Sequence, residues 1–426
     1  MKAETVYAFN GARFVEHTHF EEFKAAVLAR LGYTDHTANQ LSEFYENYAE
    51  RQGSTDPLNK ILFENIMYGR LTNVYIHKIK APSSLGVDIF KKQVDKIIDG
   101  FNGNVSVMAQ SSMKSVESFY LMDVLNVTKM GANFIAGLDY EQSGDQVTNV
   151  RFLVGKTVML KKGKSPISGY LLGGIELDFQ QRICVIMTKH TSDMLDESGD
   201  DSIKSPSGYH RFLLDKFVTP LSITRDTDLK KDREGMFVFC KSMYEKLIND
   251  VRDEVRTSAE SEIDSITRKL GKKLKALGKK PTADQVSDLS KNIHNLLLGI
   301  HIENNIPDSV MAQKAADEKL VGFPTNIDYQ NNRMNRSSTG TGQKGKPICK
   351  SENLYSLLTD FEKAQKLNKW NLSWFRDPSN PSVGRIEQTR IESMTDCLYL
   401  RFKGKKHLGK ELITHVVRTL DSCRGY

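Results

Sequence analysis

The stretch "NVRFLVGKTVMLKKGKSPISGYLLGGIELDFQQRICVIMTKH" (residues 149–190) decides the predicted fold. It contains three apolar runs, at 149–160, 168–179 and 182–190, which "KKGKSP" and a short polar turn separate. Apolar runs bounded by turn residues predict strands, and such short connections predict that consecutive strands are neighbours. We therefore expect a meander-like β-sheet with helices packed against it.

The residues before this stretch extend the same pattern. Runs at 73–81, 104–112 and 133–142 have the character of half-buried strands, the first alternating apolar and polar residues. Apolar residues at helical spacing predict helices within 19–51 and 57–70. We therefore predict that residues 1–195 form an α+β domain built on a mixed sheet.

The second half of the chain has a different character. The polar, turn-rich segment "DESGDDSIKSPSG" (196–208) predicts a linker or an exposed loop. Residues 209–426 are expected to form a mainly helical, basic domain with one late strand at 396–402 and a flexible loop at 330–350. The expected fold class is therefore α+β, with the sheet region first and the mainly helical region second.

The long helical candidates of the second half lie at 235–277 and 283–299. Thr282 and Gln285 have the spacing of a capping box that opens the second of them. Shorter helices are expected near 353–366 and 410–422.

The composition limits the class of protein. The chain has 426 residues, of which 39% are apolar and 27% charged, which is typical of a soluble globular protein. There is no run of 18 apolar residues and no signal-peptide core near the N-terminus, so we expect a cytoplasmic protein without a membrane span. The five cysteines form no CxxC pair and the histidines form no ligand motif, so we expect no disulfide framework, no metal and no cofactor.

The strongest local feature is "TRKLGKKLKALGKK" (267–280), with seven basic residues and no acidic one. The whole chain has a net charge of +7, so its remainder is neutral overall. An apolar stripe runs through this region at steps of three and four residues: Ile263, Ile266, Leu270, Leu274 and Leu277. The spacing predicts an amphipathic helix that packs on one side and is positive on the other.

A second basic run, "RFKGKKHLGK" (401–410), follows the late strand, and its glycines leave the backbone open to close approach. We predict that both runs contact the phosphates of duplex DNA, because Lys and Arg displace condensed counterions without reading the bases. The predicted DNA-binding residues are Arg268, Lys269, Lys272, Lys273, Lys275, Lys279, Lys280, Arg401, Lys403, Lys405 and Lys406.

Other interpretations of the basic helix remain open. It is equally consistent with a solvated helix face, or with a surface that docks an acidic protein partner. A membrane surface is a further alternative, but the apolar stripe lacks Trp and Phe and is better explained as core.

An enzymatic alternative is a metal-dependent nuclease. Glu176 and Asp178 would lie on one strand face, and Lys189 on the next predicted strand. The acid-x-acid spacing differs from the acid-x-Lys arrangement by which such enzymes hold Mg²⁺ and water together. We therefore assign no catalytic residues, and a nuclease-like defence effector that uses Glu176 and Asp178 stays open as the enzymatic alternative.

Three patches of the second half resemble nucleoid-associated proteins of the YejK/NdpA type. They are the aromatic-rich segment 209–247, the segment 309–327 with its turn at Phe323 and Pro324, and the segment 398–412, which contains the late strand and the residues that follow it. The resemblance implies a cytosolic, dimeric protein that binds nucleoid DNA with little sequence preference. Relatives of this family also occur in phage-defence operons, so the resemblance also implies antiviral defence as a variant of this role.

Overall fold

The computed structural model describes residues 7–101, 118–162, 165–189, 205–330, 336–404 and 406–424, with isolated residues at 103, 105–106, 109–110, 113 and 194–195. The chain divides into two compact units, Met1–Thr227 with Lys405–Thr414, and Asp228–Gly404 with His415–Tyr426. The boundary thus falls at 227/228, whereas we expected a linker at 196–208. Only residues 205–208 of that segment are described, and there Ser205 caps a helix of the first unit.

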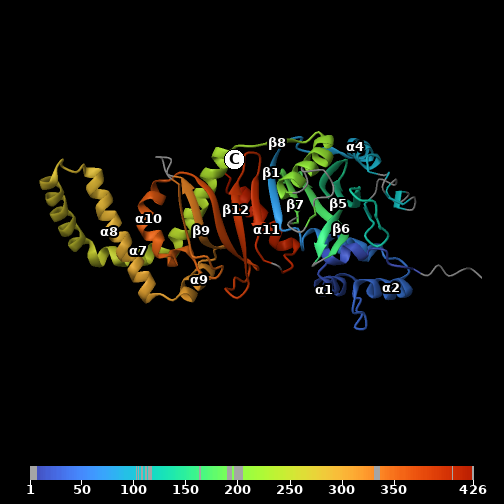
Figure 1. The fold of residues 1–426 in the computed structure, drawn as a ribbon, viewed down its shortest axis with the longest axis horizontal. Coiled ribbons are helices and arrows are strands. Elements are labelled where there is room, and N and C mark those ends of the chain that lie inside the picture. The colour runs from blue at the N-terminus through green and yellow to red at the C-terminus, as the bar shows by residue number, and fades with distance from the viewer. Residues whose placement is uncertain are drawn as a thin grey trace, which may run out of the picture. The chain divides into compact units, whose positions relative to one another are not determined.

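The first unit is built on an antiparallel sheet (Figure 1). Its strands are β1 (Asn73–Ala81), β2 (Leu85–Gly86), β3 (Phe119–Tyr120), β4 (Asn133–Ser143), β5 (Gln146–Lys162), β6 (Ser165–Asp178), β7 (Ile183–Thr188) and β8 (Thr224–Asp226). Their order is β1-β7-β6-β5-β4-β3, while β8 pairs with β1 and β2 with β5. The α+β class is confirmed, and the described strand pairs of this unit are all antiparallel rather than mixed.

The helices of the first unit are α1 (Phe20–Leu31), α2 (Leu41–Gln52), α3 (Asp56–Met67), α4 (Val87–Asp99) and α6 (Pro206–Leu213), with short turns η1 (Ala12–His17), η4 (Leu214–Val218) and η5 (Thr219–Leu221). The helical stretch predicted at 19–51 breaks at Gly32, which has φ +64°, a conformation that glycine adopts without strain. The strand predicted at 104–112 is wrong where it is described, since Ala109 and Gln110 are helical.

The opening stretch, 149–190, forms β5, β6 and β7 as predicted. Parts of its runs, such as 152–155 and 183–187, are continuously apolar because helices cover both faces of the sheet. A Cβ on Gly173 would lie 2.5 Å from Leu213 of α6, and a Cβ on the next residue, Gly174, would lie 3.1 Å from Met67 of α3. Successive strand residues point to opposite faces, so α6 and α3 lie on opposite sides of β6.

The second unit is mostly helical, as predicted, but it also contains a sheet. Its helices are α7 (Leu229–Leu277), α8 (Ala283–Asn305), α9 (Asp308–Asp317), α10 (Glu352–Lys363) and the end of α11 (Lys410–Ser422), with the turn η6 (Ile348–Lys350). Its strands are β9 (Gly322–Gln330), β10 (Arg336–Gly340), β11 (Leu367–Phe375), β12 (Ile386–Ser393) and β13 (Leu398–Phe402), in the order β10-β9-β11-β12-β13.

The predicted flexible loop at 330–350 is wrong in part. Residues 336–340 form β10, which pairs with β9 along its whole length, and η6 follows at 348–350. Residues 331–335 lie outside the described residues. The strand escaped prediction because "RSSTG" carries no apolar alternation, and its pairing depends on backbone hydrogen bonds to a neighbouring strand.

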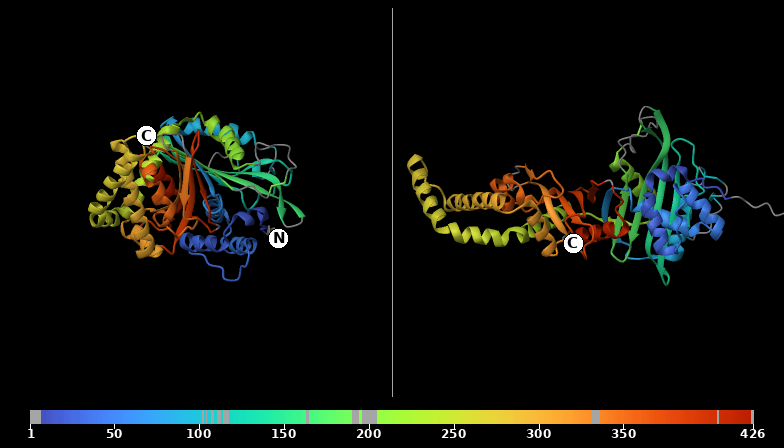
Figure 2. Two further views of the ribbon diagram at one scale, coloured as in Figure 1. Left: turned by 60° about the vertical axis from the view of Figure 1, so that its left-hand side comes forward. Right: turned by 90° about the horizontal axis from the view of Figure 1, so that it is seen from below.

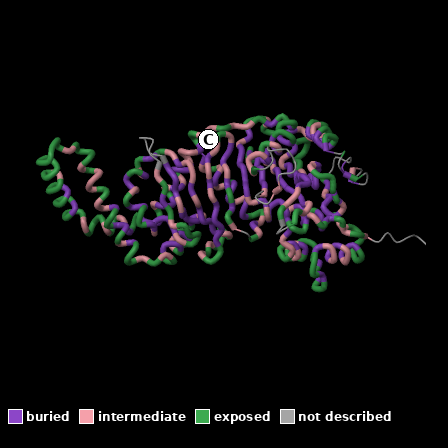
Figure 3. Tube along the Cα trace, viewed as in Figure 1, coloured by how far each residue is buried: buried purple, intermediate pink, exposed green. Residues whose placement is uncertain are grey.

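Helix α7 is 49 residues long and changes character along its length. From Met236 to Val251 it buries an apolar side against the sheet, where Phe239 meets the ring of Trp370 edge-on at 5.6 Å. Beyond Val251 only Ile263 and Thr267 are buried (Figure 3). There the helix pairs with α8, which begins at the capping box of Thr282 and Gln285 as predicted. We call residues 252–300 the helical hairpin (Figure 2).

Candidate nucleic-acid interface

The basic residues of 267–280 lie at the end of the helical hairpin. All seven are exposed: Arg268, Lys269, Lys272, Lys273, Lys275, Lys279 and Lys280. Within the described chain none of them forms an ion pair with a carboxylate, and the contact of Arg268 is a 3.3 Å hydrogen bond to the carbonyl oxygen of Asp264. The predicted cluster of positive charge is therefore open to solvent and is not neutralised within this part of the structure.

The helical repeat separates these cations into two sets. Ile263 and Thr267 are buried and mark the side of α7 that faces α8. At 100° per residue, Arg268, Lys272 and Lys275 lie on the outer side, away from α8. Lys279 and Lys280 follow in the turn beyond the end of α7 at Leu277, where Lys279 lines a groove between α7 and α8. Lys269 and Lys273 instead flank the apolar stripe. Arg268 to Lys275 spans about 10 Å of helix axis, enough to face several phosphates of a duplex.

The prediction that the apolar stripe packs is wrong for four of its five residues. Ile263 is buried, but Ile266, Leu270, Leu274 and Leu277 are between 41% and 85% exposed. The reason is that α8 is the one helix beside this part of α7 in the described structure, and it covers only the side that contains Ile263 and Thr267.

The second basic run is divided between the two units. Arg401 and Lys403 belong to the second unit and are exposed, Lys406 belongs to the first and is exposed, and Lys405 lies outside the described residues. Within the second unit, β13 lies at the other end from the hairpin tip (Figures 1 and 2). Within the second unit, Arg401 and Lys403 therefore do not form one continuous patch with the basic residues of 267–280.

The structure adds a residue that sequence reasoning missed. Arg390 of β12 is the cross-strand partner of Arg401 of β13, so both guanidinium groups lie on one face of the sheet with Lys403. Burial, followed by the charges of Arg390 and Arg401, lowers the pKa of Lys403. When the side-chain amide of Asn371 is oriented with its oxygen toward Lys403, that oxygen accepts a hydrogen bond from Nζ of Lys403 at 3.1 Å. Arg390 also donates to the carboxylate of Glu392 at 2.7 Å, so the net positive charge of this patch comes from Arg401 and Lys403. No signal in the sequence of 385–393 indicated the patch.

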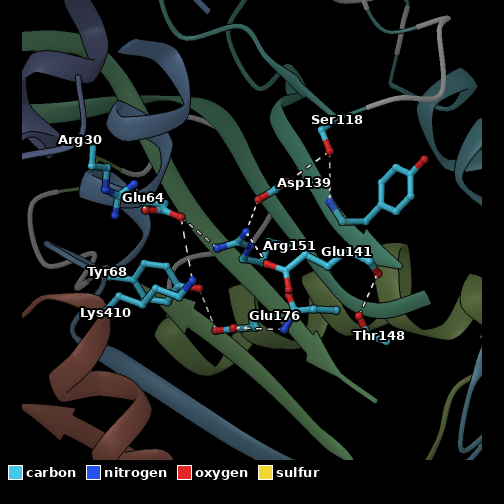
Figure 4. A network of polar contacts seen from close by, with 12 residues as sticks. Arg30, Glu64, Tyr68, Ser118, Asp139, Glu141, Thr148, Arg151, Glu176 and Lys410 are labelled. Carbon is cyan, nitrogen blue, oxygen red and sulfur yellow. Dashed lines mark hydrogen bonds and ion pairs between the residues drawn. The ribbon is translucent and has the colours of Figure 1, made fainter. Parts of the chain in front are cut away.

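The acidic residues of the nuclease alternative belong to a different kind of arrangement (Figure 4). Arg151 of β5 lies between Asp139 of β4 and Glu176 of β6, its direct cross-strand partners. Its guanidinium donates to Asp139, to Glu64 of α3 at 3.1 Å and to Glu141 at 3.3 Å. Its side chain is only 3% exposed, so Arg151 is a buried cation surrounded by carboxylates.

The two carboxylates of the nuclease alternative accept hydrogen bonds from neighbouring groups. Glu176 accepts hydrogen bonds from the hydroxyl of Tyr68 at 3.0 Å and from the amide of Asn149 at 3.5 Å. Asp178 accepts from the backbone N–H of Gln181 at 2.8 Å. The two acids of the acid-x-acid pair thus have separate partners. We interpret the network as a charge-balanced support that attaches α3 to the sheet.

Glu64 gives this network a pH dependence. Burial tends to raise the pKa of Glu64, but the hydrogen bond and charge of Arg30, with Lys410 and Arg151, outweigh it and hold the pKa below its ordinary value. A carboxyl group whose pKa is lower in the folded state than in the unfolded state stabilises the fold. This stabilisation is fully present above the pKa of the unfolded state, about 4.3, and is lost as the pH falls through the pKa of the folded state.

We therefore expect Glu64→Gln to reduce the free energy of unfolding by about 1–2 kcal/mol near pH 7 and by less below about pH 4. Urea unfolding of both proteins across this pH range measures the difference. A difference that stays constant with pH would show that the carboxylate charge of Glu64 does not contribute.

No protein-family model and no curated protein sequence matches the chain. Among the helices of the described residues, none combines the length and apolar character needed to cross a bilayer.

Proposed function

We propose that the protein binds duplex DNA through phosphate contacts, with little sequence preference, and that the end of the helical hairpin is the principal contact. The observation that carries the proposal is the cluster of seven exposed cations that lack carboxylate partners within the described chain. Positive charge that is not neutralised internally attracts a polyanion and releases its counterions on binding.

The resemblance in 209–412 supports the same class of ligand. It adds a nucleoid-associated role in the cytoplasm, with phage defence as a variant. The patch of Arg390, Arg401 and Lys403 supplies a second set of phosphate contacts on this proposal. Contacts of this kind fix the position of a protein on a duplex but carry no sequence information.

Neutralising two cations of the outer side tests the contribution of the hairpin. We expect Lys272→Ala with Lys275→Ala to weaken binding to a random duplex by roughly 10- to 100-fold at about 0.1 M salt, and to reduce the salt slope by about two. Fluorescence anisotropy across a salt series measures both quantities.

The matched control is Lys92→Ala with Lys96→Ala on α4, which removes the same charge from two exposed residues of another helix. If the control weakens binding as much as the hairpin variant, only net charge matters. Unchanged affinity and slope in the hairpin variant would remove the hairpin from the proposed interface. Salt-sensitive binding of the wild-type chain to an acidic protein, with none to DNA, would instead favour a docking subunit.

A further inference from the structure

Three methionine side chains border one cavity of the first unit. The cavity has a volume of about 220 Å³, and the described residues that line it are Met130, Gly131, Thr157, Val158, Met159, Met194 and Leu195. None of these seven residues carries a carboxylate, an imidazole or a thiol. The three thioether sulfurs are therefore the soft metal-binding atoms of this lining.

Backbone hydrogen bonds gather the three methionines around the end of β5. The turn before β4 is attached where the N–H of Gly131 donates to the carbonyl oxygen of Thr157 at 3.0 Å. Two residues further along β5, the N–H of Leu195 donates to the carbonyl oxygen of Met159 at 2.9 Å. Each bond involves a methionine or the residue next to one, so the fold itself brings the three side chains to one place.

The burial of the three side chains differs from that of methionines in the core. Methionine usually fills irregular gaps of a core, and a side chain that fills a gap leaves no cavity beside it. Met130 is instead 42% exposed, Met159 and Met194 are partly buried, and all three border a cavity. Three other methionines of the same unit are fully buried: Met67, Met122 and Met187. Because Met130 is exposed, an ion can approach the cavity from solvent.

We propose that this cavity binds one soft monovalent metal ion, Cu(I), through the sulfurs of Met130, Met159 and Met194. Thioethers select Cu(I), whereas Mg²⁺ and Ca²⁺ need oxygen ligands and Zn²⁺ sites use thiolate, imidazole or carboxylate. A sphere with the volume of this cavity is about 7–8 Å across, and the three rotatable bonds of each methionine allow the sulfurs to converge on one ion within it.

No sequence motif indicates this site. The three methionines are 29 and 35 residues apart along the chain (159 − 130 and 194 − 159), and they meet only through strand and turn contacts. The expectation that the chain binds no metal rested on the spacing of cysteine and histidine, which carries no information on thioethers.

Methyl NMR with Ag⁺, a redox-inert substitute for Cu(I), tests the site. In a Cys423→Ser background, where the remaining cysteines are buried, we expect one equivalent of Ag⁺ to shift the methyl signals of Met130, Met159 and Met194 and to leave the other methionine signals in place. Zn²⁺ is expected to shift none of the three. X-ray absorption of the Cu(I) complex, prepared without oxygen, is expected to show sulfur as the first shell.

Leucine substitutions separate the sulfur atoms from the apolar shape of the cavity. Leucine has nearly the volume of methionine, so each variant is expected to remain folded, which circular dichroism checks. We expect Met130→Leu, Met159→Leu and Met194→Leu each to weaken Ag⁺ binding by at least about 10-fold, since even the loss of an outer partner of a metal site costs that much. Titration calorimetry measures the affinity. Met394→Leu, at a partly buried methionine of the second unit, is the matched control and is expected to leave it unchanged.

Two results would overturn the proposal: no shift of the three methyl signals with Ag⁺ up to about 100 µM, or equal Ag⁺ affinity with and without all three leucines. Xenon uptake by both the wild type and the triple variant, without Ag⁺ binding, would assign the cavity to an apolar ligand instead. The metal site and the DNA interface fail separately. The triple variant is expected to bind duplex DNA as the wild type does, because the cavity shares no residue with the basic cluster of 267–280.

Discussion

Replacing Arg151 with alanine is expected to lower the free energy of unfolding of the first unit by about 3–5 kcal/mol. The guanidinium is almost fully buried and donates to Asp139 and Glu64, whose side chains are 4% and 12% exposed. Its loss removes the cation that these carboxylates share. Glu64 keeps Arg30 and Lys410, but Asp139 is left in the interior without a cation, which is strongly destabilising. Urea unfolding, with hydrogen exchange to follow β4, β5 and β6, measures the loss.

Two further variants locate the cause of this effect. Arg30→Ala removes another cation from Glu64, but Arg30 is half exposed, so we expect a loss below about 1 kcal/mol. Asp139→Asn in the Arg151→Ala background removes the buried carboxylate that is left without a cation, and we expect it to recover part of the stability. A loss below about 1 kcal/mol for Arg151→Ala itself would contradict a supporting role for the network.

The second large effect is expected at Arg424. Its Nε and Nη2 donate to the two carboxylate oxygens of Asp232, at 2.7 and 3.0 Å, and both side chains are buried. The pair joins the residue two positions after α11 to the first turn of α7. We expect Arg424→Ala to lower the free energy of unfolding of the second unit by about 3–5 kcal/mol, because Asp232 loses its buried cationic partner.

Tryptophan fluorescence reports this loss directly, because the two tryptophans of the chain, Trp370 and Trp374, both lie on β11 of the second unit. Lys230→Ala provides a control in the same turn of α7, where the exposed lysine lies 4.0 Å from Glu234. We expect the control to change stability by less than about 0.5 kcal/mol. Equal shifts for the two variants would mean that the buried pair contributes no more than a surface pair.

The fold was predictable where a local pattern carries the information. The strands at 149–190 have long apolar runs with short connections, and the capping box of α8 is encoded by Thr282 and Gln285 alone. Strands β9 to β12 were missed, because β10 is polar and because the pairing of β9 with β11 joins residues about 40 to 50 positions apart. Pairing of that kind depends on tertiary contacts and not on local propensity.

The candidate site was predictable in composition but not in arrangement. The spacing of Arg268, Lys272 and Lys275 correctly predicted a separate positive side of α7. The same periodicity could not distinguish an apolar stripe that meets the core from one that is exposed, because both need residues at steps of three and four. Arg390 could not be predicted because its neighbour Arg401 comes from another strand, and register is not a local property.

The central claim is that exposed cations on this chain bind duplex phosphates, and a titration of a random duplex of about 40 base pairs over a salt series tests it most directly. With the three outer cations of α7 and the two lysines of the following turn engaged, we expect tight binding at about 50 mM salt and a log–log salt slope of about −4 or steeper. No complex at about 50 mM salt, or a complex that does not weaken as salt rises, would contradict binding dominated by phosphates.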